Sequence, residues 1–366
     1  MFLKTAISFI FAHLLLLSGT NTKVYTAPDI KPTQKASSTI AIIATSTKPA
    51  VKNSKTATTT PKAKMIPVKT VAETPKVETK PEPAPNFVAI NEFARKATVN
   101  ILCTAKGGEL SPISGKGAIV GPSGLILTNA HIGQYLLLRN YREKDFIQCV
   151  ARTGSPAYPK YNIELVYISP TWVSENKTQL KDQNPQGTGE NDFAFLRITG
   201  MVDGSKTPDS FPFVTMNIRE AINVNEPVLL SSYPAGFLGG LSILQNLNVT
   251  TAITNIQDVF TFRDGTIDII SVGGTVVSQK GSSGGLVVDK NSTLIGVIST
   301  SSNGDTTSSR GLNAITLGYI NRAIEKELGF GFKEFLSQTP ENFAKTFAST
   351  TAPILTKIIT DELNKQ

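Results

Sequence analysis

The chain has 366 residues, of which 40% are hydrophobic and 17% charged, with two Cys, two His and a formal net charge of +8. This apolar content can fill a core and excludes a wholly disordered chain. Two cysteines exclude a disulfide-dense mini-protein and a four-cysteine zinc site.

The positive charge lies entirely in the N-terminal quarter. Residues 1–86 contain twelve Lys, no Arg and four acids, whereas the remaining 280 residues hold 24 basic and 24 acidic side chains. A basic protein would ordinarily suggest nucleic acid as a partner. Because the later part is neutral, we expect no nucleic-acid binding by the folded region.

Residues 1–20 resemble an export signal. Lys4 is followed by an apolar run over 6–17 and then by Ser18, Gly19 and Thr20. The run is shorter than the roughly 17–25 residues of a membrane-spanning helix. No A-x-A cleavage site follows it, so a cleaved signal peptide and a retained signal anchor both fit. We therefore expect an exported protein, whether secreted, periplasmic or associated with the cell envelope.

Residues 21–86 are predicted to form a disordered Lys/Thr/Pro/Ala-rich linker. Between 27 and 86 there are ten Lys, nine Pro and no aromatic residue. Such a stretch buries too little apolar surface to offset its ordering entropy, and its prolines and like charges keep it extended. It would tether the folded part to the membrane or the envelope.

Order is expected from residue 87 onward, in short apolar runs separated by turn residues. Many short strands of this kind favour an all-β barrel or sandwich. Helices are predicted at 91–97 and 317–328, and residues 329–366 form an amphipathic, helical C-terminal tail after a domain at 87–328. The predicted strands are 98–104, 116–120, 125–129, 146–151, 193–198, 227–232, 275–277, 286–288 and 294–299.

Three segments of this β pattern carry residue types that suit nucleophilic catalysis. His131 follows a predicted strand, Asp192 opens another, and Ser283 lies in a Gly-Ser-Ser-Gly-Gly run. A serine hydroxyl needs a neighbouring base, and that base needs a third group to fix its tautomer. His13 falls in the export segment, so His131 is the candidate base. We predict His131, Asp192 and Ser283 as a catalytic triad.

The glycine run also matches the G-x-S-x-G turn of α/β-hydrolases. In those enzymes the acid and the histidine follow the serine. Here no histidine follows Ser283, and the order is His131, Asp192, Ser283. This order excludes the α/β-hydrolase interpretation and is that of chymotrypsin-type enzymes.

Thr128-Asn-Ala-His131, Asn191-Asp192 and Gly281-x-Ser283-Gly-Gly together resemble the trypsin/chymotrypsin superfamily. The stretch Gly-Leu-Ile-Leu-Thr-Asn-Ala-His is most similar to the bacterial high-temperature-requirement (HtrA-like) branch. The resemblance covers roughly residues 95–325 and implies an all-β, chymotrypsin-like double β-barrel. His131 and Asp192 would come from the first six-stranded barrel and Ser283 from the second. The implied activity is that of a serine endopeptidase acting on polypeptides, with no cofactor and no metal.

The resemblance also assigns roles around the nucleophile. The backbone amides of Gly281 and Ser283 would form the oxyanion hole. Ser299 matches a serine that hydrogen-bonds the triad acid in relatives, and Ser299, Thr300 and Ser301 would lie on the strand that pairs with substrate. Val277 would form the base of the primary specificity pocket, with Ser301 and Gly311 as its walls. Because Val277 is not acidic, we expect cleavage after small or medium apolar residues.

The chain departs from relatives at two points. Ser282 stands where zymogen-activated relatives carry an acid, so that route of activation is not expected. After residue 328 only 38 residues remain, below the roughly 50 of an ordinary domain, so we expect no PDZ domain. The alternative function is a catalytically silent binding or adhesion protein on the same fold, tethered at the cell envelope. The oligomeric state has no signal in the sequence.

Cys103 and Cys149 each lie in a predicted strand, on either side of His131. In an exported protein such a pair can form a disulfide. Two buried free thiols are the alternative, because sequence does not give the separation of the two side chains.

Overall fold

The computed structural model describes residues 85–365, apart from 109, 183–186, 237, 263–264 and 303. The predicted export segment, 1–20, and nearly all of the predicted linker, 21–86, lie outside the described residues. The described residues belong to one compact unit. Within them, every helix is too short or too polar to cross a membrane.

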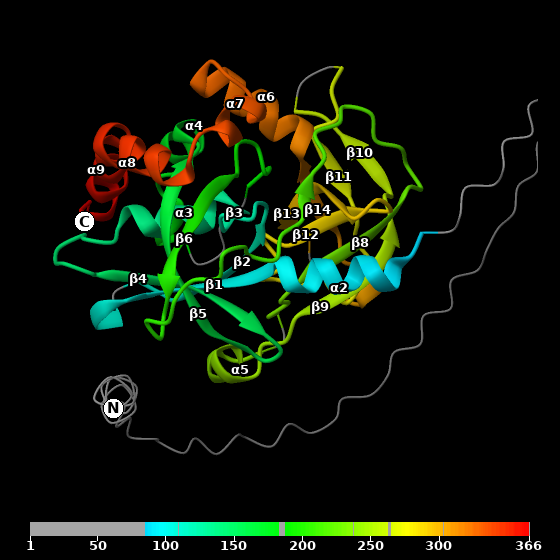
Figure 1. The fold of residues 1–366 in the computed structure, drawn as a ribbon, viewed down its shortest axis with the longest axis horizontal. Helices are drawn as coiled ribbons and strands as arrows, with labels where there is room; N and C mark the ends of the chain where they lie inside the picture. The colour runs from blue at the N-terminus through cyan, green and yellow to red at the C-terminus, as the bar shows by residue number, and fades with distance from the viewer. Residues whose placement is uncertain are drawn as a thin grey trace, which may run out of the picture. The chain divides into compact units, whose positions relative to one another are not determined.

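The described residues are dominated by β-strands, which gather in two groups on either side of the molecule (Figure 1). The strands are β1 (Thr98–Ala105), β2 (Ile113–Ile119), β3 (Leu125–Thr128), β4 (Ile147–Gly154), β5 (Ala157–Ile168), β6 (Ala194–Met201), β7 (Thr215–Met216), β8 (Pro227–Ser232), β9 (Thr250–Asn255), β10 (Asp258–Phe260), β11 (Ile269–Ser271), β12 (Leu286–Asp289), β13 (Thr293–Ser301) and β14 (Leu312–Thr316).

The first group is a closed barrel. Its six described strands follow the order β1-β2-β3-β6-β5-β4, and all neighbours are antiparallel. Side chains alternate across each strand, so Val99, Ile101 and Cys103 of β1 are buried with the core of this barrel. The predicted first barrel is therefore present.

The second group is a curled, half-barrel sheet, which we call the open sheet, and it stands where the chymotrypsin-like fold has its second barrel. Among the described residues its order is β10-β11-β14-β13-β12-β8-β9, with β7 paired to β13. β9 and β10 belong to one extended segment that changes partner between Ile256 and Gln257. The Ile256 amide donates to Glu226 O, whereas the Gln257 amide donates to Ser271 O. This change of partner leaves β9 and β10 as the two edges of the open sheet.

The described helices lie around these two groups. They are α2 (Phe87–Ala97), α3 (Ala130–Leu137), α4 (Pro170–Glu175), α5 (Gly240–Gln245), α6 (Leu317–Leu328), α7 (Phe332–Ser337), α8 (Pro340–Thr350) and α9 (Ala352–Leu363).

Residues 275–277, predicted as a strand, form a turn instead. The Ser278 amide donates to Thr275 O at 2.9 Å, and the Val277 amide donates to Thr275 Oγ1 at 3.2 Å. The Thr275 amide in turn donates to Ser278 Oγ at 3.1 Å. These hydroxyl groups satisfy the backbone locally, which is how Ser and Thr favour turns over strands.

The predicted helical tail forms α7, α8 and α9, and α8 and α9 cover one side of the first barrel (Figure 1). Phe332, Phe335 and Phe347 are buried in the same core cluster as the barrel strands. Phe335 and Phe347 pack edge-on against Tyr167 of β5, with ring centroids 6.2 and 5.5 Å apart. The tail is therefore part of the folded core.

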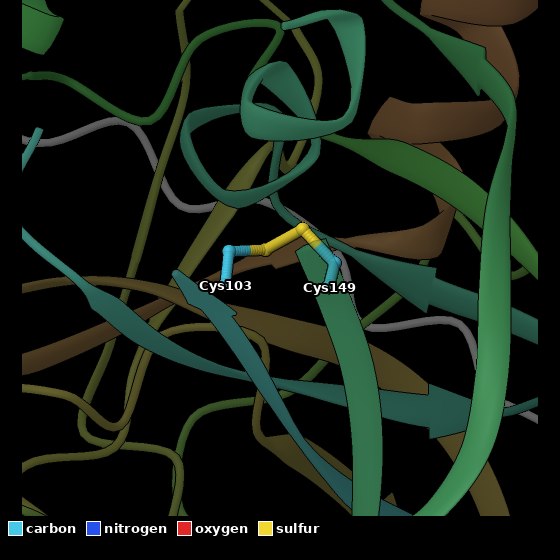
Figure 2. The surroundings of a disulfide bond; sticks show 2 residues. All are labelled: Cys103 and Cys149. Carbon is cyan, nitrogen blue, oxygen red and sulfur yellow. A yellow bond between two sulfur atoms is a disulfide. The ribbon is translucent and has the colours of Figure 1, made fainter. Parts of the chain in front are cut away.

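Cys103 and Cys149 form a disulfide between β1 and β4 (Figure 2). The two residues are register partners, and their Cα atoms are 4.1 Å apart. The 46-residue separation encloses β2, β3 and α3, and therefore His131. The crosslink closes the chain around the part of the barrel that carries the predicted base.

Candidate active site

His131 lies in the first turn of α3, directly after β3. Its backbone amide donates to Asp192 Oδ1 at 3.0 Å, and its Nδ1 lies 2.9 Å from Asp192 Oδ2. With the proton on Nδ1, the ring donates to the carboxylate and leaves Nε2 as an acceptor. The carboxylate thus fixes both the position and the tautomer of the imidazole.

Asp192 is held by a tight turn at the start of β6. Its amide donates to Gly189 O at 3.2 Å, and Asn191 adopts a φ of 56°. The Tyr319 hydroxyl accepts from the Asn191 amide and donates to Asn191 Oδ1, both at 2.9 Å. Asn129 Nδ2 donates to Asp192 O at 3.0 Å. The strained turn is therefore clamped from both sides.

The Asp192 carboxylate is buried and surrounded by donors. Ser299 Oγ of β13 donates to Oδ2 at 2.7 Å, so the open sheet contacts the acid of the first barrel. Burial raises the pKa of Asp192, but the charge of His131 and the hydrogen bonds from His131 and Ser299 outweigh it and hold this pKa below its ordinary value. The acid stays ionised beside the imidazole.

Ser283 lies in the loop before β12, which we call the nucleophile loop (residues 281–284). Gly281 and Gly284 have φ of +81° and +84°. A Cβ on Gly284 would lie 1.8 Å from Lys116 O, so this position requires glycine. Ser283 Oγ donates to Ser299 O at 3.2 Å, and among the described residues no hydrogen bond joins it to His131.

The Gly281 and Ser283 amides, the predicted oxyanion-hole donors, have no hydrogen-bond acceptor among the described residues. The neighbouring amides of Ser282 and Gly284 are different, because they donate to Gln279 O and Ile298 O. The two amides are thus available to a carbonyl oxygen of a substrate.

Ser282, next to the predicted nucleophile Ser283, points into the protein. Its side chain is buried and its Oγ donates to Val277 O at 2.6 Å. Val277 is fully buried in the core of the open sheet. The predicted base of the specificity pocket therefore lies behind the nucleophile loop, and its role in specificity stays a prediction.

The other predicted substrate residues lie at the end of β13 and the start of β14. Thr300 is partly exposed and Ser301 is exposed. The Gly311 amide donates to Ser302 Oγ at 3.0 Å, and Gly311 O accepts from the Ser302 amide at 3.2 Å. Gly311 therefore pairs with Ser302, one residue beyond Ser301.

A cavity of about 600 Å³ lies against His131. α3 contributes Gln134 and Tyr135 to its wall, and Leu363 of α9 closes another side. The C-terminal tail thus borders the space next to the predicted base. The rest of the wall is formed by Leu110, Ser111, Pro112, Ile113, Tyr141, Arg142, Gln179, Leu180, Lys181 and Asp182.

Lys116 of β2 is a residue of the site that the sequence analysis missed. Its side chain is fully buried, and its backbone amide donates to Ser283 O at 2.9 Å. The available signal was a lysine flanked by Gly115 and Gly117 in a strand that otherwise reads as buried. Among the described residues, no cluster of three or more His, Cys, Asp or Glu could hold a metal ion.

Comparison with known proteins identifies the family. The model of the trypsin-like peptidase domain matches residues 115–297, which is half of the chain. This match includes His131, Asp192 and Ser283. The comparison with curated proteins gives no match.

Several solved structures are similar to this chain at low identity. The active form of the Rv3671c protease from M. tuberculosis is 17% identical, with 70% of this chain and 95% of that chain covered and a TM-score of 0.40. A serine endoprotease from Yersinia pestis is 18% identical, with 68% of each chain covered and a TM-score of 0.42. The HtrA-type protease AlgW with a tripeptide is 19% identical, with 67% and 65% covered and a TM-score of 0.42. On the family match, this chain belongs to the trypsin-like peptidases, a family of serine endopeptidases.

Proposed function

We propose that the protein is an exported serine endopeptidase in which His131, Asp192 and Ser283 form the catalytic triad. The observation that carries this proposal is the hydrogen-bond chain from Ser299 through Asp192 to His131. It joins the open sheet, which bears Ser283, to the barrel that bears the imidazole.

In the proposed reaction, Ser283 Oγ attacks the carbonyl carbon of the scissile peptide bond while His131 Nε2 takes the hydroxyl proton. The carbonyl oxygen becomes negative and accepts hydrogen bonds from the Gly281 and Ser283 amides. His131 then gives its proton to the leaving amine, and the C–N bond breaks to leave an ester on Ser283. Water, deprotonated by His131, hydrolyses this ester and restores the serine.

The hydrogen bond from Ser283 Oγ to Ser299 O marks a resting arrangement in this scheme. The hydroxyl must turn toward His131 Nε2 before attack. Catalytic hydrogen bonds are often long or misaligned without substrate and tighten when it binds. The same hydrogen bond also favours the alternative function, a catalytically silent binding protein on this fold. Such a protein does not need the Ser283 hydroxyl to rotate toward His131.

Cleavage after small or medium apolar residues is the proposed specificity. It rests on the family resemblance and on the absence of an acid at Val277. A panel of peptides that differ only at the residue before the cleaved bond tests it. Preference for Val, Ala or Leu is expected, and preference for Lys or Arg would overturn it.

Hydrolysis of a casein substrate by Ser283→Ala and Ser282→Ala tests the mechanism. The two serines are adjacent, but the Ser282 hydroxyl is buried against Val277 O. We expect Ser283→Ala to abolish hydrolysis. Ser282→Ala should still hydrolyse casein, at a rate proportional to the fraction of the variant that is folded. Equal hydrolysis by wild type and Ser283→Ala would refute the triad.

Export and tethering complete the proposal, on the basis of the signal-like segment 1–20 and the linker 21–86. The domain limits that we propose are 87–328 for the peptidase and 329–366 for the helical tail. Fractionation of cells that express the full chain, with and without residues 1–20, tests the export. Equal distribution of both forms in the cytoplasm would contradict it.

A further inference from the structure

Lys116 spans the back of the nucleophile loop. Its backbone contacts one end, where its amide donates to Ser283 O and its carbonyl oxygen lies against Gly284. Its amine lies near the other end, with Nζ 3.4 Å from the position that a Cβ on Gly281 would occupy. Backbone and amine of one buried residue therefore lie close to both ends of the nucleophile loop.

The Lys116 amine has few partners for an ammonium group. Nζ donates to Ser114 O at 3.3 Å, which is its one hydrogen bond among the described residues. An ammonium carries three donors, so most of its hydrogen-bonding capacity is unused. The side chain is fully buried and has no contact with bulk solvent.

A second buried cation lies on the same face. Lys116, Asn100 and Arg152 are register partners across β2, β1 and β4. Arg152 donates to Asn100 Oδ1 and to the carbonyl oxygens of Ala157, Ile243 and Leu244. In the described part of the chain, neither cation forms an ion pair with a carboxylate. The region behind the nucleophile loop is therefore positively charged and uncompensated.

An unpaired buried ammonium is unfavourable in the resting protein. Burial, and then the charge of Arg152, lower the pKa of Lys116 to about 7. A negative charge placed nearby would reverse this cost. In the proposed reaction such a charge forms on the carbonyl oxygen at the Gly281 and Ser283 amides.

We propose that Lys116 is a positioning residue for the transition state, whose ammonium behind Gly281 stabilises the oxyanion through the nucleophile loop. This inference rests on the proposed function. It gives the cation a counter-charge, the oxyanion that the proposed reaction forms at the Gly281 and Ser283 amides. The backbone contacts of the same residue hold the loop in the conformation that this requires.

The inference carries a pH dependence. The titratable side chains around the Lys116 amine are Arg152 of β4 and, beyond it, Tyr233, whose hydroxyl donates to Gly154 O at 3.0 Å. No described carboxylate contributes to the shift of Lys116. In the free enzyme the ammonium loses its proton near pH 7, so kcat/KM should decline above this pH.

The test uses the full chain with Lys116→Met, Lys116→Arg and, as a control, Lys106→Met, which removes an exposed lysine of the same barrel. The readouts are kcat and KM on the best peptide of the specificity panel from pH 5.5 to 9.5, together with the midpoint of urea unfolding. Met has an uncharged side chain one heavy atom shorter than that of Lys, and Arg keeps a cation over this whole pH range.

We expect Lys116→Met to lower kcat on the order of 10- to 100-fold with little change in KM, less than the loss of a direct oxyanion donor. It should also remove the alkaline decline and raise the unfolding midpoint at pH 6, because an unpaired buried charge is gone. Lys116→Arg should retain more activity than Lys116→Met and show no alkaline decline. Lys106→Met should behave as wild type.

A wild-type kcat and pH profile in Lys116→Met would overturn the inference and leave the proposed function intact. A parallel loss of kcat and of stability would show a merely structural role and overturn it as well. If Lys116→Met does not fold, Lys116→Arg decides, since an unchanged alkaline decline in that variant contradicts the inference. A wild-type chain that cleaves no peptide and reacts with no fluorophosphonate would instead refute the proposed function itself.

Discussion

The first barrel and the open sheet contribute different parts of the site. The barrel is closed, is crosslinked by Cys103–Cys149 and is covered by α8 and α9, and it carries His131 and Asp192. The open sheet presents Ser283 on a loop whose glycines have positive φ. The imidazole and the carboxylate, which need a fixed orientation, therefore come from the closed barrel, the more constrained of the two regions. The proposed nucleophile comes from a loop that contacts Lys116 of the barrel.

Two of the buried charged groups of the barrel, Asp192 and Lys116, show the same contrast on a smaller scale. Asp192 accepts hydrogen bonds from the His131 ring, the His131 amide and Ser299. Lys116 has one acceptor among the described residues, Ser114 O. A fully paired acid can hold a neighbour in place throughout the reaction. An unpaired cation is stabilised most when a negative charge forms beside it.

Removing the charge of Asp192 should have the largest effect on activity. Asp192→Asn keeps the size of the side chain but favours the wrong tautomer of His131. By analogy with other triads, kcat should fall by about 10⁴-fold. Steady-state kinetics on the best peptide substrate measures it, with circular dichroism as the control for folding. A loss below tenfold in a folded variant would mean that Asp192 does not orient the base.

Loss of the disulfide tests how much of the barrel's constraint is covalent. The crosslink closes a loop of 46 residues, for which chain entropy gives about 4 kcal/mol of stabilisation. The double variant Cys103→Ser/Cys149→Ser should unfold at lower urea concentration by a corresponding amount. Equal midpoints for the oxidised wild type and the double variant would show that the strand pairing alone constrains this barrel.

The buried Lys116 should make stability depend on pH. Its pKa is about 7 in the folded protein, against the ordinary lysine value of 10.5 in the unfolded chain. Between these values the unfolded state binds more protons, so stability should rise with pH by up to about 1.4 kcal/mol per unit. Urea unfolding of wild type and Lys116→Met from pH 6 to 10 measures the difference. If the difference in unfolding free energy between the two proteins stayed constant with pH, Lys116 would have the same pKa in the folded and unfolded states.

Ser299→Ala should give the smallest effect of the four. It removes one hydrogen bond to Asp192 and leaves both His131 contacts in place. We expect a decrease in kcat of about tenfold, since hydrogen bonds to charged groups contribute about 1.5–3 kcal/mol. Loss of this hydrogen bond should also raise the pKa of Asp192. The variant should therefore lose activity at a higher pH than wild type when the solution is acidified. An unchanged pH profile would show that Ser299 serves only to pack β13.

Strong apolar patterns let the sequence predict much of the fold. The runs at Pro227–Ser232 and Leu317–Leu328 were placed with the bounds that the structure gives. β5 was missed because it contains Pro159 and a register shift, and β9 because its residues are mostly polar. α3 was missed because its apolar residues continue those of β3. Its Gly133 is explained only by the packed structure, where a Cβ would lie 2.7 Å from Ala194 Cβ.

The candidate site could be predicted as far as residue types and chain order determine it. His131, Asp192 and Ser283 stand in the order of chymotrypsin-type triads, and the family match covers all three. Lys116 could not be found in this way, because its importance lies in cross-strand register with Asn100 and Arg152 and in contact with a loop more than 160 residues away. Such long-range register becomes visible only when the strands are paired.

The most direct measurement is covalent labelling of the full chain by a fluorophosphonate, followed by intact-mass and peptide mass spectrometry. The reagent reacts with a serine that a neighbouring base activates. We predict a single adduct on Ser283, lost in Ser283→Ala and His131→Ala and retained in Ser282→Ala. No adduct under conditions that label trypsin fully, or an adduct that persists in Ser283→Ala, would contradict the assignment of Ser283 as the nucleophile.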